Sequence, residues 1–467
     1  MTLAFFVVAG AAQSVGAAIY VVNQTGDVSD GVCDANCTLR DAINTANRSN
    51  TLDFIDFASP LFDTPQTINL TSAQLTIINP LIITGRGARL LTVRRSSAGG
   101  TPRFHIFGVS GAVTVGISGI TISNGDGGSG FGGGITNNGG TLLLNNVAVS
   151  GNTQGFLGGG IRQDGGTTTI SNSTISGNTA GSGGGGIFVN SGGTVNIANS
   201  TVSGNSASSN SGGGIYSGGT LNMNNVTVSD NFAAYSGGGV SNLGGTVNTR
   251  NSIIAGNFAT GGNSPDVEGG FTSNGSNLIG RLTGSTGFTQ PTDKTNVAAN
   301  LAPLANNGGQ TDTHALYAGS PAIDAGDNCV VNQSCGTNNP SAALTNDQRG
   351  EGFPRQVGAA VNIGAVEVQL APTAAAVSVS GRVTTESGRG IRSVIVTMTD
   401  MHGNVRTATS TSFGYYRFEN VAAGETYIFA ARGKRFFFEQ NAQVHSIMEE
   451  TSDINFVAGE RTVFSAN

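Results

Sequence analysis

The sequence predicts an all-β protein: a parallel β-helix with a short N-terminal capping helix, followed by a small β-sandwich. Three observations support this prediction. A motif of about 26 residues repeats through the middle of the chain, apolar and polar residues alternate within each repeat, and a separate set of alternating segments occupies the carboxyl-terminal region. Alternation with a period of two is typical of strands rather than helices.

The composition is unusual but favours a folded protein. Of 467 residues, 73 are glycine and only 11% are charged, yet 37% are apolar, which is more than a disordered chain normally contains. The net charge of −6 comes from scattered groups, with no basic cluster of the kind that nucleic-acid binding requires. We therefore expect no nucleic-acid partner.

The repeat is visible in several columns that keep the same period. Gly-Gly-Gly precedes a branched residue at Ile135, Ile161, Ile187, Ile215 and Val240. One asparagine column contains Asn146, Asn172, Asn199, Asn225 and Asn251, and a second contains Asn152, Asn178, Asn205, Asn231 and Asn257. Fixed self-similarity at this length indicates stacked structural units.

Each repeat contains three short alternating segments separated by bends. In the third copy, Val195 and Ile197 are expected to point to one side and Asn196 to the other. Three strands and three bends make one coil of a parallel β-helix, whose coils stack about 4.8 Å apart. We expect the asparagines of each column to form a structural ladder, since a side-chain amide both donates and accepts.

The combination of corner asparagines with "GGGI" and "SGN" resembles the right-handed parallel β-helix repeats of bacterial surface proteins. The right-handed sense follows from that resemblance and from the general preference of parallel crossovers. We assign residues 111–260 to these repeats. A leucine-rich repeat is excluded because its leucine spacing is absent.

The segment Cys33–Asn50 is expected to cap the first coils, which occupy residues 19–110. Thr38 and Asp41 have capping-box spacing, and the next turns place four apolar residues on one helical face: Leu39, Ala42, Ile43 and Ala46. The stretch from Cys37 to Ala42 resembles the CSLREA motif of secreted bacterial β-helix proteins. That resemblance implies an exported protein.

A second flank, residues 261–370, contains the last coils and a cap. Its segments Leu301–Asn328, Asn346–Arg355 and Asn362–Glu367 resemble the choice-of-anchor Q region of exported bacterial proteins. Asn362 stands where that family usually has Asp. The resemblance predicts the architecture of this region but gives little information about its activity.

After a linker at residues 371–376, residues 377–467 read as several short strands with frequent turns, which favours a β-sandwich. Gly414, Tyr416 and Phe418 match the Gly-x-Tyr-x-Phe strand of the carboxypeptidase regulatory-like, transthyretin-like module, which this region resembles. The resemblance implies a non-catalytic contact or spacer domain. The basic-aromatic segment Arg432–Glu439 is interpreted as one of its strands, with contact to an anionic polymer as the alternative.

Several features predict export. Residues 1–18 resemble a signal peptide without its positive region, which a translation start upstream of Met1 would explain. No other apolar run has the length of a membrane helix. The cysteines form two close pairs, Cys33 with Cys37 and Cys329 with Cys335, so we expect two local disulfides, with a zinc site as the rival. The expected location is secreted or on a bacterial cell surface.

The regular coils contain few charged residues between Gly111 and Asn257: Asp126, Arg162, Asp164, Asp230 and Arg250. None forms the carboxylate pair that glycoside hydrolysis needs. The second flank contains more acidic residues: Asp324, Asp327, Asp347 and Glu367. These four acids could gather near Arg349, where they would form a cap, a calcium site or a catalytic site. We expect His314 to be structural, and no cofactor other than this candidate calcium.

The favoured function is that of an exported structural or adhesion protein which contacts polysaccharide, matrix or neighbouring cells. The alternative is a carbohydrate-active enzyme, a polysaccharide lyase or hydrolase, with its site in the flanks. Ice binding is disfavoured because the column Leu143, Thr169, Asn196, Asn222 and Asn248 interrupts a flat threonine face. The sequence carries no signal for an oligomeric state.

Overall fold

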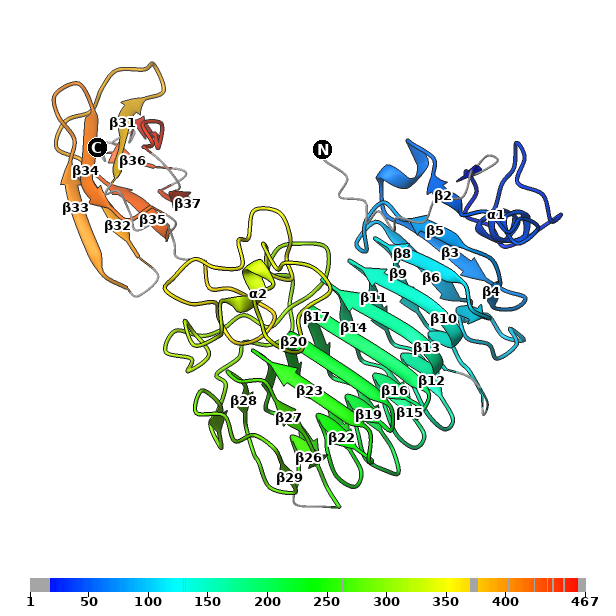
Figure 1. Ribbon diagram of the computed structural model, residues 1–467. Coiled ribbons are helices and arrows are strands. Elements are labelled where there is room, and N and C mark those ends of the chain that lie inside the picture. Colours follow the sequence, from blue (N-terminus) through cyan, green and yellow to red (C-terminus); the bar gives the residue numbers. More distant parts are fainter. Residues whose placement is uncertain are drawn as a thin grey trace. The chain divides into compact units, whose positions relative to one another are not determined.

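Figure 1 shows the computed structural model, in which the described residues form two compact units that divide between Val368 and Gln369. The described residues are 17–128, 130, 132–261, 264–369, 377–400, 403–423, 425–434, 436–438, 441–447 and 450–460. The expected linker and all but the last two residues of the expected signal peptide lie outside them, as does Glu439.

The first unit is the predicted parallel β-helix. Its first coils contain β1 (Ile19–Val22), β2 (Asp53–Phe57), β3 (Gln66–Leu70), β4 (Leu75–Ile77), β5 (Leu81–Thr84), β6 (Leu91–Arg95), β7 (Phe107–Ser110), β8 (Thr114–Ser118) and β9 (Thr121–Ser123). Its last coils contain β26 (Val267–Gly270), β27 (Thr272–Ser273), β28 (Leu278–Ile279), β29 (Ser285–Thr286) and β30 (Lys294–Thr295).

The repeats between them alternate long and short strands: β10 (Ile135–Asn145), β11 (Ala148–Ser150), β12 (Thr153–Gln154), β13 (Ile161–Ser171), β14 (Thr174–Ser176), β15 (Thr179–Ala180), β16 (Ile187–Val189), β17 (Gly193–Ser203), β18 (Ser206–Ala207), β19 (Ile215–Ser217), β20 (Thr220–Ser229), β21 (Phe232–Ala233), β22 (Val240–Asn242), β23 (Thr246–Arg250), β24 (Ile253–Ile254) and β25 (Phe258–Ala259). Five of the two-residue strands, β12, β15, β18, β21 and β25, form their own small sheet on one edge of the rod, visible in Figure 1 below β13 and β16.

Equivalent residues of successive repeats pair in register. Val195 lies opposite Leu221 and Ile197 opposite Met223, and all four side chains are buried inside the coil. This confirms the prediction that equivalent residues of successive repeats stack on one another. The glycine triplets allow the coils to approach closely, since a Cβ on Gly185 would clash with the carbonyl oxygens of Gly213 and Ser206.

Helices are few and short. The predicted cap is α1 (Leu39–Ala46), whose capping box joins Thr38 and Asp41 in both directions, and its apolar face packs on β1, β2 and β4. In the described part of the chain, the others are the 3₁₀ turn η1 (Leu61–Asp63) and α2 (Cys329–Asn332). Among the described residues, no helix has the length and apolar character needed to cross a bilayer.

The second unit has the two sheets of the predicted sandwich. One contains β31 (Val377–Thr385), β34 (Tyr415–Val421), β36 (Phe436–Phe437) and β38 (Phe456–Glu460), and the other contains β32 (Ile395–Thr399), β33 (Val405–Thr409), β35 (Glu425–Arg432) and β37 (Ala442–Ile447). Tyr416 and Phe418 from the first sheet share one buried apolar cluster with Phe429 from the second.

Candidate functional site

The second asparagine column forms a continuous ladder inside the rod. Nδ2 of Asn152 donates to Oδ1 of Asn178 at 2.9 Å, and the same bond repeats through Asn205, Asn231 and Asn257. The last amide donates to the carboxylate of Asp266, also at 2.9 Å, and burial raises the pKa of that carboxyl. Because the ladder is buried, its amides hold the coils together and are not accessible to a ligand.

The first asparagine column has a different role. All five members adopt left-handed backbone angles, with φ between 44° and 54°, at the bend of the long strand. Only Asn225 and Asn251 bond each other's side chains within the described column, at 3.3 Å. The bend turns these amides outward, where Asn199 donates to the carbonyl oxygen of Asn346 at 2.7 Å and Asn251 to that of Asp327 at 2.9 Å. The last three members of the column, Asn199, Asn225 and Asn251, therefore hold the carboxyl-terminal flank against the rod.

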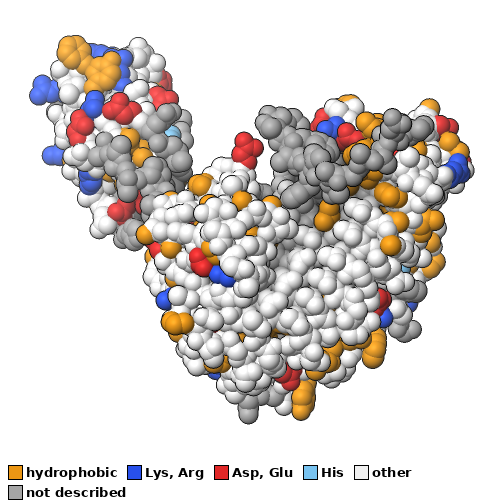
Figure 2. All heavy atoms as spheres, in the orientation of Figure 1, with side chains coloured by type: hydrophobic (Ala, Val, Ile, Leu, Met, Phe, Trp, Pro, Cys, Tyr) orange, Lys and Arg blue, Asp and Glu red, His pale blue; other side chains and the backbone are white. Residues whose placement is uncertain are grey.

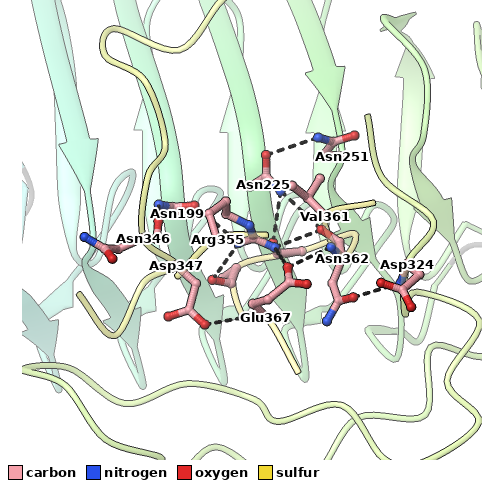
Figure 3. A network of polar contacts seen from close by, with 12 residues as sticks. Asn199, Asn225, Asn251, Asp324, Asn346, Asp347, Arg355, Val361, Asn362 and Glu367 are labelled. Carbon is pink, nitrogen blue, oxygen red and sulfur yellow. Dashed lines mark hydrogen bonds and ion pairs between the residues drawn. The ribbon is translucent and has the colours of Figure 1, made fainter. Parts of the chain in front are cut away.

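Figure 3 shows the polar cluster where this flank docks, with the guanidinium of Arg355 directed at the first asparagine column. Arg355 is fully buried and pairs with Glu367 at 3.2 Å, while Asp347 pairs with Arg349 at 2.6 Å. Asp347 also accepts the backbone N–H of Glu367, at 2.8 Å. Burial raises the pKa of Glu367 from 4.5 to about 7, against the lowering effect of the Arg355 charge, and burial lowers the pKa of Arg355.

The four acids considered as calcium ligands are not gathered at one point. Asp327 pairs with Arg250 at 2.8 Å, and the backbone of Asp324 donates to Oδ1 of Asn362 at 2.8 Å. Asp347 and Glu367 are 0% and 1% exposed and are engaged by arginines. Within the described ranges, no group of three or more His, Cys, Asp or Glu side chains is arranged to hold a metal ion. The arrangement is that of a cap held by ion pairs and backbone hydrogen bonds.

Both cysteine pairs are disulfide-bonded, Cys33 to Cys37 and Cys329 to Cys335. This arrangement leaves no thiolates for the rival zinc site. The second disulfide joins the start of α2 to the loop that continues through residues 336–341. That loop passes over the outer face of the repeats and forms one wall of a groove.

The groove has a volume of about 330 Å³ and is bounded on its other side by β17, β20 and β23. Its lining is rich in amides and contains no ionisable side chain: Thr169, Asn196, Ile197, Ala198, Asn222, Asn224, Asn248, Asn338, Asn339, Pro340 and Ser341. This volume lies at the lower end of the ~300–1000 Å³ typical of small-ligand sites.

A third amide ladder forms the floor of this groove. Asn222 donates to Asn196 at 2.8 Å, and Asn248 donates to Asn222 at 2.7 Å. Each ladder bond uses one donor and one acceptor site, so every amide keeps at least one N–H and one lone pair for another partner. The sequence pattern predicted this column only as an interruption of a threonine face. The signal was present, because three consecutive repeats carry asparagine at the same place.

Asn224 has a buried side-chain oxygen in the groove that lacks a hydrogen-bond partner in the described part of the chain. Its side chain is only 3% exposed, and its Oδ1 accepts no hydrogen bond from the described residues. Its Nδ2 donates to Asn338 of the overlying loop over a long 3.4 Å. A buried acceptor without a partner is costly, and such atoms in folded proteins usually meet water or a ligand.

A second cavity of about 350 Å³ lies beside His314. The ring of His314 is buried, with Nδ1 2.7 Å from the carbonyl oxygen of Ala302 and Nε2 2.8 Å from Oγ of Ser203. Asp230 lies farther from Nε2, at 3.9 Å, and is largely exposed. Ser203 is 2% exposed, so this pair joins the flank to a coil and does not present a nucleophile to the cavity.

No protein-family model and no curated protein matches the chain by sequence. Among solved structures, the crystal structure of pectate lyase Pel9A aligns with 75% of this chain and 96% of its own, at 14% identity and a TM-score of 0.44.

Proposed function

We propose that the protein is an exported surface protein of the structural or adhesion type, which binds an uncharged polysaccharide in the groove beneath residues 338–341. The observation that supports this most directly is the unpartnered Oδ1 of Asn224, buried at the floor of an accessible groove. A sugar hydroxyl that donates to this oxygen would remove the cost of leaving it unpaired.

The ligand class follows from the chemistry of the lining. The amides of Asn196, Asn222 and Asn248 offer alternating donors and acceptors along the rod, which suits the hydroxyl groups of a sugar chain. The absence of an ionisable side chain among the lining residues disfavours an anionic polymer, whose charges would have no counter-charge in the groove.

Export is supported by the two disulfides, because such bonds persist mainly in oxidising compartments. We infer display at a bacterial surface from the resemblance of the two flanks to those of exported β-helix proteins. A stacked rod also suits this role, because solenoids present extended surfaces to their partners.

The alternative, a lyase or hydrolase with its site in the flanks, would need accessible acids. Asp347 and Glu367 are buried and engaged by Arg349 and Arg355, and each already accepts a backbone N–H. They are therefore poorly placed to reach a glycosidic bond. Asp324 and Asp327 are more exposed, but Asp327 is paired with Arg250, which favours binding over cleavage.

The test is affinity gel electrophoresis with hydroxyethyl cellulose, dextran and polygalacturonate in the gel. We expect retardation by an uncharged polymer and loss of at least about tenfold in affinity for Asn222→Leu, since the equivalent position of an earlier repeat is Leu143 and the fold should tolerate the change. The matched control is Asn138→Leu, at an exposed position outside the groove.

Equal retardation of both variants and the wild type would contradict the groove as the binding site. Retardation by polygalacturonate alone would contradict the uncharged ligand. Release of new reducing ends or unsaturated products from any of the polymers would favour the enzyme alternative.

A further inference from the structure

A row of exposed aromatic side chains lies on a different edge of the rod from the groove. It follows the small sheet formed by β12, β15, β18, β21 and β25 and the turns directly after those strands. We call it the aromatic strip and define it by Phe156, Phe232, Tyr235 and Phe258, which are 54%, 36%, 58% and 62% exposed. Figure 2 shows hydrophobic side chains along this lower edge, below β12 and β15 of Figure 1.

The clustering is not a general property of the surface. Among the described residues of the first unit, five Phe or Tyr side chains are strongly exposed, and four of them belong to the strip; the fifth is Tyr317. Phe232 and Phe258 are register partners on adjacent coils, so their rings repeat along the rod axis at the coil spacing of about 4.8 Å.

Register forces these rings outward. The residues that follow Phe232 in β21 and Ser206 in β18 are Ala233 and Ala207, and both are fully buried. Side chains alternate between the two faces of a strand, so turning the phenylalanine inward would require exposing the alanine and enlarging the coil. The exposure of Phe232 is therefore built into the repeat and is not removed by a change of rotamer.

The surroundings of the strip identify the kind of partner. The chain segments 153–157, 179–183, 206–211, 232–236 and 258–261 contain no Asp, Glu, Lys, Arg or His. The same outward column that holds Phe232 and Phe258 holds hydroxyl residues in the earlier coils: Thr153, Thr179 and Ser206. Charge lies beyond Thr153 at one end of the column, where its register neighbour Asp126 pairs with Arg103. At the other end, aromatic faces in line with hydroxyls suit a ligand that has both C–H faces and hydroxyl groups.

We propose that the aromatic strip is a second contact surface for an uncharged polysaccharide, which lies along the rod with sugar rings stacked on Phe232, Tyr235 and Phe258. Each pyranose ring presents an apolar C–H face to an aromatic ring and its hydroxyls to the threonine and serine side chains. The strip takes its ligand class from the proposed function but is a separate site, since none of its residues lines the groove.

The test uses the double variant Phe232→Thr, Phe258→Ser, in which each new residue already occupies the same column at Thr179 and Ser206. The matched control is Tyr317→Thr, an exposed aromatic outside the strip. Retardation in gels containing hydroxyethyl cellulose or dextran is measured for the wild type, both variants and the groove variant Asn222→Leu.

We expect the double variant to bind about tenfold more weakly than the wild type, because each ring contributes a separate stacking contact, and Tyr317→Thr to bind normally. Light scattering after gel filtration gives the oligomeric state of the same samples. Equal retardation of the double variant and the wild type overturns the proposal, as does a wild-type dimer that the double variant converts to monomer. Loss of binding in Asn222→Leu alone supports the groove and rejects the strip, and the reverse result supports the strip alone.

Discussion

The guanidinium of Arg355 and the carboxylate of Glu367 lie 3.2 Å apart with 0% and 1% of their side chains exposed, at the point where the second flank docks on the rod. The same guanidinium donates to the carbonyl oxygens of Asn362 and Ala365, at 2.9 and 3.1 Å. Its Nη1 also donates to Oδ1 of Asn199 at 3.4 Å, so one arginine joins the segment Asn362–Glu367 of the flank to the outer face of the β-helix (Figure 3).

We expect Arg355→Leu to lower the free energy of unfolding of the first unit by about 3–5 kcal/mol, because Glu367 loses its buried counter-charge and two carbonyl oxygens lose a donor. The control is Arg162→Leu, which breaks a partly exposed pair with Asp164 and should cost less than about 1 kcal/mol. Urea unfolding followed by circular dichroism measures both. Similar losses in the two variants would contradict a special role for the buried pair.

We expect the ionisation of Glu367 to contribute to the pH dependence of the protein's stability. Its folded-state pKa, about 7, is above its ordinary value of 4.5, so the folded protein retains a proton that the unfolded chain releases between these values. The contribution of this group to stability is therefore fully present below pH 4.5 and is lost as the pH rises through 7. We expect the melting temperature to fall between pH 5 and pH 8 in the wild type and to fall less in Glu367→Gln. A steeper fall in the variant would contradict this assignment.

The inner ladder should be far more sensitive to substitution than the outer one. Asn205→Leu removes the acceptor for both the backbone N–H and the side chain of Asn178, and it removes the side-chain donor to Oδ1 of Asn231, which keeps only its bond from the backbone N–H of residue 205. With each unsatisfied buried group costing about 1–3 kcal/mol, we expect a loss of at least about 3 kcal/mol. Asn196→Leu, in the same repeat but on the outer face, should cost less than about 1 kcal/mol. Thermal unfolding of the two variants compares them directly.

The disulfide Cys329–Cys335 should support the groove more than it supports the rod. It closes the loop that precedes the groove wall at residues 338–341, and that wall contacts the repeats through long bonds such as Asn338 to the carbonyl oxygen of Met223 at 3.4 Å. We expect Cys329→Ser, Cys335→Ser to weaken polysaccharide retardation by about tenfold, because the wall is no longer held in place before binding. Cys33→Ser, Cys37→Ser is the control and should retain binding.

Sequence alone determined the parts of this protein that depend on local pattern. The constant period and the two-residue alternation predict stacked coils, since Val195 must meet Leu221 once the repeats are in register. The capping box of Thr38 and Asp41 and both disulfides likewise join residues that are close in the chain. Such contacts can be predicted from sequence because the partners are either equivalent positions of neighbouring repeats or residues a few positions apart in the chain.

Only the tertiary structure decided what each polar column does. The two predicted asparagine columns have the same period, but the bend at Asn199 turns one outward to the flank, while Asn205 remains in the interior ladder. The bond from Asn199 to Asn346 spans 147 residues and follows no period. The groove, its unpaired Asn224 oxygen and the burial of Arg355 arise from the docking of that flank, a non-repeating contact whose geometry depends on three-dimensional packing.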